Sequence, residues 1–199
     1  YIVTEFAPNG SLEDAVVASV QKPFSKMKAL EWALQTASGI GYLHSRNFVH
    51  RDIKPHNILL NGMNKAVVAD LGTVRQCAES IPSQFKLTKE EIHAKLETLC
   101  KNMDDQSAAL TASMTMTATG PVFGGVKTKM IGTPLYMAPE QFNNEYSYQI
   151  DVWAFGVTMC RLFSLKWPYP TTIGVNELIR KVGAGLLRPD PLSVEDVPE

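Results

Sequence analysis

Cysteine is scarce in this sequence, and the three that occur, Cys77, Cys100 and Cys160, stand far apart in the chain. Their odd number and wide spacing exclude a disulfide framework and a paired Cys-x-x-Cys metal site. Few, unpaired cysteines are typical of proteins in reducing compartments. We therefore expect the protein in the cytoplasm or the nucleus.

Neither sign of charge is in excess, because 19 lysines and arginines stand against 20 aspartates and glutamates, for a net charge of −1. A near-neutral chain exerts no general attraction on nucleic acid or anionic lipid, so no nucleic-acid partner is expected. Long hydrophobic runs are missing as well. The apolar stretch at 152–160 has nine residues, whereas a membrane-spanning helix needs about 20, so no transmembrane segment is predicted.

What is present is an ordinary globular composition, with 45% hydrophobic and 20% charged residues among 199. A chain of this length can bury a full hydrophobic core, which predicts one domain, with room for an insertion. It opens directly on the strand-like run Tyr1–Phe6, without a leader-like segment. We expect a fragment that begins inside a fold.

Capping signals and apolar spacing predict the helices. Ser11, followed three residues later by Asp14, predicts the start of a short helix. Apolar residues at helical spacing over 27–44 predict a long helix with one buried face. The stretch at 150–165 is hydrophobic on nearly all sides and predicts a buried helix, and a last helix is expected around 175–182.

Two short β-like runs, at 58–60 and 66–69, flank Asn61-Gly62 and predict a β-hairpin. The stretch at 76–127 differs in composition from both flanks. Within it, a capping signal and a one-sided apolar stripe predict an amphipathic helix over 89–103, which needs a surface or partner to cover it. The Thr- and Ala-rich stretch at 107–120 is typical of a loop.

The run His50-Arg51-Asp52-Ile53-Lys54-Pro55-His56-Asn57 lies between the long helix and the hairpin. Here the sequence resembles the eukaryotic protein kinase family, whose catalytic loop reads His-Arg-Asp, with Lys two and Asn five residues beyond the Asp. Further motifs of the family follow in order: Asp70-Leu71-Gly72, Gly132-Thr133-Pro134, Ala138-Pro139-Glu140 and the buried-helix sequence Asp151–Gly156.

The resemblance implies a role for each motif residue. Asp52 orients the acceptor hydroxyl and accepts its proton, and Lys54 is a cation for the transferring phosphate. Asn57 and Asp70 supply oxygen ligands to Mg²⁺, as this hard ion requires. Thr133 positions the substrate, and together with Lys54 it matches the serine/threonine type of the family.

By the same resemblance, residues 1–12 correspond to the last strand of the N-lobe and the hinge. Thr4 is then the gatekeeper, the backbone groups of Glu5 and Ala7 pair with the adenine edge, and Leu59 is the apolar floor beneath the ring. The implied cofactors are ATP and Mg²⁺.

The resemblance also implies a regulatory site. Arg51 directly precedes Asp52, and in the family such an arginine binds a phosphate on the activation segment. Arg75 stands where a second basic residue commonly lies, and Thr128, twelve residues before Glu140, is the expected carrier of the phosphate. The alternative carriers are the threonines at 111, 115, 117 and 119, which the spacing disfavours because they would have to order a longer loop.

The implied fold class is α+β, mainly helical in this chain, with a kinase-like C-lobe, a short β-hairpin at the catalytic cleft and a final N-lobe strand. Residues 1–10 would form that strand and the hinge, 11–75 and 126–199 the C-lobe, and 76–127 an insertion in the activation segment. The glycine-rich loop and N-lobe lysine of the family would precede Tyr1, so the 199 residues alone are expected to be inactive.

We therefore expect a protein serine/threonine kinase, with the tyrosine-kinase-like group favoured by the hinge and by Leu71. One alternative is a pseudokinase or scaffold that binds a partner through the helix at 89–103. Another is a small-molecule phosphotransferase of related fold, which the motifs at 132–134 and 138–140 disfavour because they build a peptide-binding platform in the family.

Overall fold

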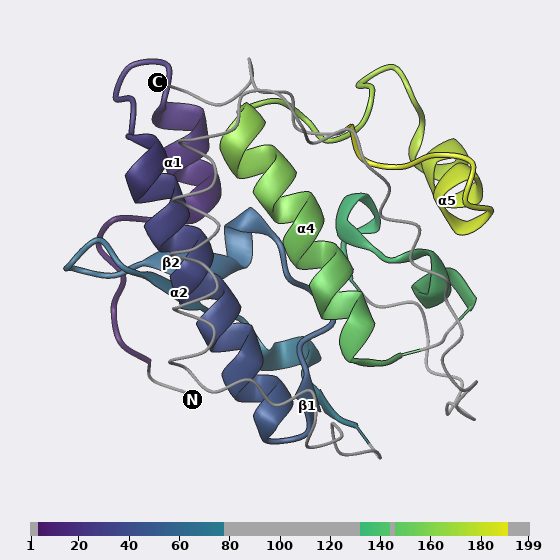
Figure 1. Cartoon of the computed structure of the whole chain (residues 1–199), viewed down its shortest axis with the longest axis horizontal. Coiled ribbons are helices and arrows are strands. Elements are labelled where there is room, and N and C mark those ends of the chain that lie inside the picture. Colours follow the sequence, from purple (N-terminus) through teal and green to yellow (C-terminus); the bar gives the residue numbers. More distant parts are fainter. Residues whose placement is uncertain (1–3, 78–131, 144–145, 191–199) are drawn as a thin grey trace, which may run out of the picture.

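The structure is a computed structural model, and it describes residues 4–77, 132–143 and 146–190. Helices and two small antiparallel sheets make up this part of the chain, an α+β arrangement (Figure 1). The elements are α1 (Leu12–Ala18), α2 (Lys26–Ser45), β1 (Phe48–Val49), β2 (Ile58–Leu60), β3 (Ala66–Val68), β4 (Arg75–Gln76), α4 (Tyr148–Ser164) and α5 (Val175–Gly183).

Serine side chains begin the first two helices. The Asp14 backbone N–H donates to Ser11 Oγ at 3.2 Å, and the Ser11 N–H donates back to Asp14 Oδ2 at 2.7 Å, which confirms the predicted start of α1. The Lys28 N–H donates to Ser25 Oγ at 3.1 Å and begins α2. The predicted long helix, the buried helix and the last helix are confirmed as α2, α4 and α5.

The predicted hairpin is confirmed, but its turn is longer than the Asn61-Gly62 pair. Strands β2 and β3 pair from Ile58 opposite Val68 to Leu60 opposite Ala66. The Asn61 side chain organises the loop, because its Oδ1 accepts from the N–H groups of residues 63 and 65, each at 3.0 Å. The left-handed residue of this loop is Asn64, at φ 57°, and not Gly62.

Figure 1 shows α2 and α4 side by side, with β2 beside the middle of α2, β1 near its lower end and α5 on the far side of α4. One hydrophobic cluster joins α1, α2, β2 and α4 and includes Leu12, Trp32, Ile58 and Leu162. A second lies between α4, α5 and the segment at 134–136 and includes Ile53, Tyr136, Val157 and Leu178. The catalytic-loop candidate at 50–57 runs between these two clusters.

The opening strand predicted at 1–6 is not seen in the described part. Residues 1–3 lie outside it, and residues 4–7 have no strand partner within it. A strand is stable only where its backbone groups pair with another strand, and Phe6 is 82% exposed here. The predicted helix at 89–103, the loop at 107–120 and almost all of the predicted insertion also fall outside the described residues.

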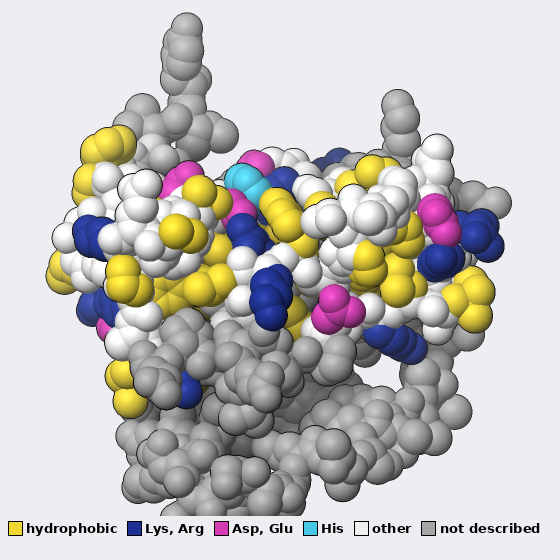
Figure 2. Space-filling view, turned by 90° about the horizontal axis from the view of Figure 1, so that it is seen from above, with side chains coloured by type: hydrophobic (Ala, Val, Ile, Leu, Met, Phe, Trp, Pro, Cys, Tyr) yellow, Lys and Arg dark blue, Asp and Glu magenta, His cyan; other side chains and the backbone are white. Residues whose placement is uncertain are grey.

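Basic, acidic and hydrophobic side chains are interspersed over the face drawn in Figure 2, as the near-neutral net charge leads one to expect. Within the described ranges, no helix combines the length and the apolar character needed to cross a bilayer.

Candidate active site

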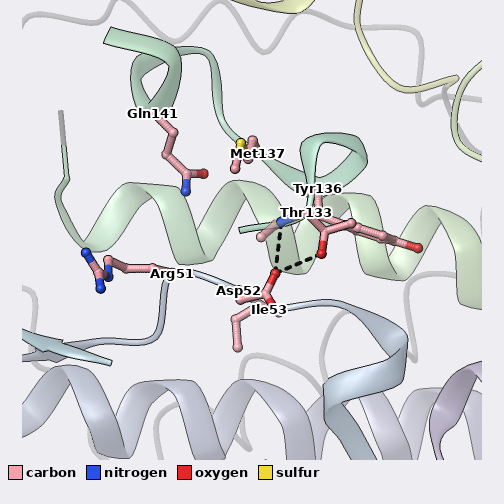
Figure 3. A pocket seen from close by; sticks show the side chains of 8 residues that line it. Arg51, Asp52, Ile53, Thr133, Tyr136, Met137 and Gln141 are labelled. Carbon is pink, nitrogen blue, oxygen red and sulfur yellow. Dashed lines mark hydrogen bonds between the residues drawn. The ribbon is translucent and has the colours of Figure 1, made fainter. Parts of the chain in front are cut away.

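Asp52 is held by hydrogen bonds from three side chains and one backbone group. Its Oδ2 accepts from Lys54 Nζ at 2.8 Å and from Asn57 Nδ2 at 2.9 Å. Its Oδ1 accepts from the backbone N–H and the hydroxyl of Thr133, each at 3.0 Å. Figure 3 shows the carboxylate directed at Thr133, beside a small hollow that Arg51, Tyr136, Met137 and Gln141 also line.

Lys54 closes this network, because its Nζ also donates to Thr133 Oγ1 at 2.7 Å. Thr133 therefore contacts both Lys54, 79 positions earlier in the chain, and Asp52, 81 positions earlier. Gly132 makes this approach feasible: it has φ +123°, and a Cβ on it would lie 2.8 Å from the Arg51 carbonyl oxygen.

Asp52 is an anion at neutral pH. Burial by itself raises the pKa of this carboxyl, but the hydrogen bond and charge of Lys54, with the hydrogen bonds of Thr133 and Asn57, outweigh burial. The net pKa lies below the ordinary aspartate value. The carboxylate is therefore available to accept a hydrogen bond or a proton from a neighbouring hydroxyl.

Asp151, in the first turn of α4, holds the backbone of the catalytic-loop candidate at residues 50 and 51. It is completely buried, and its Oδ1 accepts from the Arg51 N–H while its Oδ2 accepts from the His50 N–H, each at 2.8 Å. His44 Nε2 lies 2.8 Å from the same Oδ2. These bonds hold Arg51 in the left-handed conformation, φ 71°, that turns the chain into Asp52.

His50 connects the loop with the end of β3. It is fully buried, its Nε2 lies 2.9 Å from the Ala69 carbonyl oxygen, and its Nδ1 lies 3.4 Å from the backbone nitrogen of Asp52. Both ring nitrogens are thus engaged with backbone groups, and this residue has a structural role.

Asn57 and Asp70 lie at the same end of the hairpin, because the Ala69 N–H donates to the Asn57 carbonyl oxygen at 2.8 Å. The Asn57 amide nitrogen donates to the Asp52 carboxylate and, at 2.8 Å, to its carbonyl oxygen, so the side-chain oxygen faces elsewhere. Asp70 is exposed, and its Oδ1 accepts from the Gly72 N–H at 3.3 Å. An amide oxygen and a carboxylate are the hard donors that Mg²⁺ takes, so this pair fits the ion.

The predicted hinge is tied to the hairpin by its second half. The Asn9 N–H donates to the Leu60 carbonyl at 3.2 Å, and the Leu60 N–H donates to the Gly10 carbonyl at 2.8 Å. Ser11 forms a bridge with the half-buried Leu59, and the Gly10 N–H donates to the Ala7 carbonyl oxygen at 3.4 Å. Thr4 and Glu5 are exposed, and no hydrogen bond within the described residues ties either to the hairpin.

Comparison with known proteins decides the family. The family model described as the protein kinase domain matches residues 1–93 and 106–188. This chain belongs to the protein kinase family. The kinase match leaves out 94–105, which fall inside the predicted insertion, but the boundaries of that insertion stay a prediction.

Known kinases of both acceptor types resemble the chain. Serine/threonine-protein kinase Nek4 of Mus musculus is 28% identical over 192 residues, covering 96% of this chain and 19% of the relative. Serine/threonine-protein kinase PKH2 of Saccharomyces cerevisiae is 30% identical over 176 residues, covering 86% and 13%. Protein-tyrosine kinase 6 of Mus musculus is 29% identical over 194 residues, covering 96% and 33%. The chain thus spans a third or less of the length of these kinases.

The structure brings together most residues singled out in this kinase sequence. Asp52, Lys54, Asn57 and Thr133 form one network, and Arg75 lies near Arg51. Thr128 is outside the described residues. Sequence patterns assign no role to Asp151 or His44, because an aspartate in the first turn of a helix is ordinarily a partner for the helix dipole. The one available signal was a charged residue at the edge of an otherwise apolar stretch.

Proposed function

We propose that this chain carries the phosphoryl-transfer site of a protein serine/threonine kinase, which moves the γ-phosphoryl group of ATP to Ser or Thr hydroxyls of proteins. The closed network of Asp52, Lys54, Asn57 and Thr133 carries this proposal. It provides an anionic carboxylate, fixed on both oxygens, next to a cation and beside the segment that would hold a peptide.

In the proposed mechanism, Asp52 accepts a hydrogen bond from the acceptor hydroxyl, orients it and takes up its proton as the phosphoryl group is transferred. Lys54 places a positive charge beside the carboxylate, where negative charge on the transferred group needs compensation. Asn57 and Asp70 would hold Mg²⁺, and Leu59 with the hinge backbone would hold the adenine. ATP would supply the phosphoryl group, and Mg²⁺, when bound, would provide positive charge for its phosphate oxygens.

The hydrogen bond from Lys54 to Thr133 supports a serine/threonine acceptor, because both residues match the serine/threonine pattern of the family. Sequence identity does not decide between the types, since serine/threonine and tyrosine kinases resemble the chain almost equally. Peptides identical except for Ser, Thr or Tyr at the acceptor position test this point with the full-length protein.

Two substitutions in the full-length protein test the site. Asp52→Asn removes the group that orients the hydroxyl and is expected to abolish transfer with ATP affinity retained. Asp70→Asn removes an Mg²⁺ ligand and is expected to abolish transfer while also weakening Mg²⁺-dependent ATP binding. Asp190→Asn, on an exposed residue outside the site, is the matched control. Loss of ATP binding in Asp52→Asn equal to that in Asp70→Asn would overturn the assigned roles.

A further inference from the structure

Arg51 has its side chain buried between three segments of the chain. Its Nε donates to the Thr73 carbonyl oxygen at 2.6 Å, and its guanidinium carbon lies 5.4 Å from the centre of the Tyr146 ring. The residue is 5% exposed, and Figure 3 shows its side chain directed away from Asp52. The side chain of Arg51 therefore joins the catalytic loop to the segment after Asp70 and to the segment before α4.

Among the residues that the structure describes, the charge of this guanidinium is incompletely compensated. No carboxylate among the described residues lies within ion-pair distance of it. Arg75 is close, because it pairs with Val49, two residues before Arg51, in the β1–β4 ladder. Burial and the charge of Arg75 both lower the pKa of Arg51, whereas Tyr146 and Asp151 oppose this shift. The negative face of an aromatic ring stabilises such a cation without a formal charge.

We propose that Tyr146 is a positioning residue for the catalytic loop, whose ring supports the buried Arg51 guanidinium and so fixes the backbone that presents Asp52. Tyr146 has a firm base for this task, because it packs on the cluster of Val49, Ala138 and Ile150. The inference rests on the proposed function for its effect on catalysis, since Asp52 is the group being positioned.

The ring face and the hydroxyl are separable by substitution. Tyr146→Phe keeps the ring, whereas Tyr146→Leu keeps an apolar side chain without the π face. Tyr42→Leu is the matched control, because the Tyr42 ring lies 5.3 Å from Arg46 in a similar contact, but it is 61% exposed in the last turn of α2 and does not line the hollow beside Asp52.

In the full-length kinase, we expect Tyr146→Leu to lower kcat about tenfold, the change that a buried cation–π contact is worth, with KM for ATP unchanged. Tyr146→Phe, which keeps the ring, should lose clearly less than Tyr146→Leu, and Tyr42→Leu should retain kcat. In an Arg51→Met background, Tyr146→Leu should cause no further loss, because the cation it supports is gone. Unchanged kcat in Tyr146→Leu, an equal loss in Tyr146→Phe, or the same loss in the Arg51→Met background would overturn the proposal.

A second measurement does not need turnover. The backbone N–H groups of His50 and Arg51 are protected from hydrogen exchange by their bonds to Asp151. If the Tyr146 ring fixes this backbone, Tyr146→Leu should speed hydrogen exchange in a peptide that contains the two groups and leave exchange in α2 unchanged. If Tyr146→Leu speeds hydrogen exchange but the wild-type protein transfers no phosphate, the proposed function fails and the positioning role stands. If transfer depends on Asp52 but neither exchange nor kcat responds to Tyr146→Leu, the positioning role fails.

Discussion

Asp52 and Asp151 are buried carboxylates on the two sides of one short loop, and their partners give them different tasks. Side-chain donors from Lys54 and Thr133 surround Asp52, which keeps 9% of its surface exposed. Backbone N–H groups occupy both oxygens of Asp151, which has no exposure at all. The first can therefore exchange a partner for a substrate hydroxyl, whereas the second is committed to holding the loop.

Stability should depend on the ionisation of Asp52 in acid. Because its pKa is lowered in the folded state, its carboxylate stabilises the fold above the unfolded value of about 3.9, and this contribution is lost as the pH falls through the folded value. The stability of the wild type relative to Asp52→Asn should thus be constant near neutral pH and decrease below about pH 4. Urea unfolding of both proteins between pH 7 and pH 3 measures this. A wild-type advantage that grows in acid would contradict it.

Asp151→Asn should destabilise the protein by about 2–4 kcal/mol. The amide that replaces the carboxylate has one acceptor oxygen, so its NH₂ group would face the backbone N–H of either His50 or Arg51. One buried donor is then left without an acceptor, and kcat should fall with stability because Asp52 follows directly. Chemical denaturation and a peptide phosphorylation assay check both effects, and Asp190→Asn should change neither. Full activity in Asp151→Asn would refute its anchoring role.

At the scale of elements, α2 and β3 touch closely at one glycine. A Cβ on Gly39 would lie 2.9 Å from Val68 Cγ2, whereas a Cβ on Gly41, half a turn further on, would meet nothing within 4 Å. The two positions differ in packing but share a helix interior, which makes them a matched pair.

Gly41→Ala should stabilise the protein by up to about 1 kcal/mol through helix propensity. Gly39→Ala should instead destabilise it by about 1–3 kcal/mol, because Val68 is branched at Cβ and cannot move aside without shifting the hairpin. Thermal or urea unfolding of the two variants is the measurement. Equal effects of both substitutions would show that β3 does not press on α2 as the structure has it.

Local signals explain which elements could be predicted. The Ser11 and Asp14 caps, the apolar spacing of α2 and the turn residues near Asn61 lie within a few positions of what they determine. The ion pair of Glu13 and Arg161, 2.7 Å apart and buried between α1 and α4, joins residues 148 positions apart and has no local signature. The candidate site was predictable through its motifs, but the anchoring by Asp151 depends on how α4 packs under the loop.

At the scale of the whole molecule, several segments that are distant in sequence hold the catalytic loop in place. Asp151 holds it from α4, His50 ties it to the hairpin, and Thr133 reaches it from the segment before α4. Thr73 adds a reciprocal contact, because its hydroxyl donates to the His50 carbonyl at 2.8 Å while its own carbonyl accepts from Arg51. A change in the activation segment therefore reaches Asp52 through few intervening bonds.

This connection gives physical grounds for the regulatory role proposed for Thr128. A phosphate carries about −1.5 to −2 charges at neutral pH, and the buried Arg51 with the neighbouring Arg75 offers two cations that repel each other without it. A phosphate between them would relieve that repulsion and add charge-assisted hydrogen bonds. Phosphorylation at Thr128 should therefore raise activity by joining the activation segment to the catalytic loop through these arginines.

The test compares Thr128→Ala, Arg75→Ala and the double variant in the full-length enzyme, with the phosphorylation state verified by mass spectrometry. Arg75 is preferred over Arg51 because it is exposed and its loss leaves the bond to Thr73 intact. If one phosphate joins the two residues, each single variant should lose about tenfold in kcat or more, and the double variant should lose little beyond either. Thr111→Ala, elsewhere in the predicted insertion, should remain fully active. Additive losses would mean that Thr128 and Arg75 act separately, and full activity in Thr128→Ala would remove Thr128 from the mechanism.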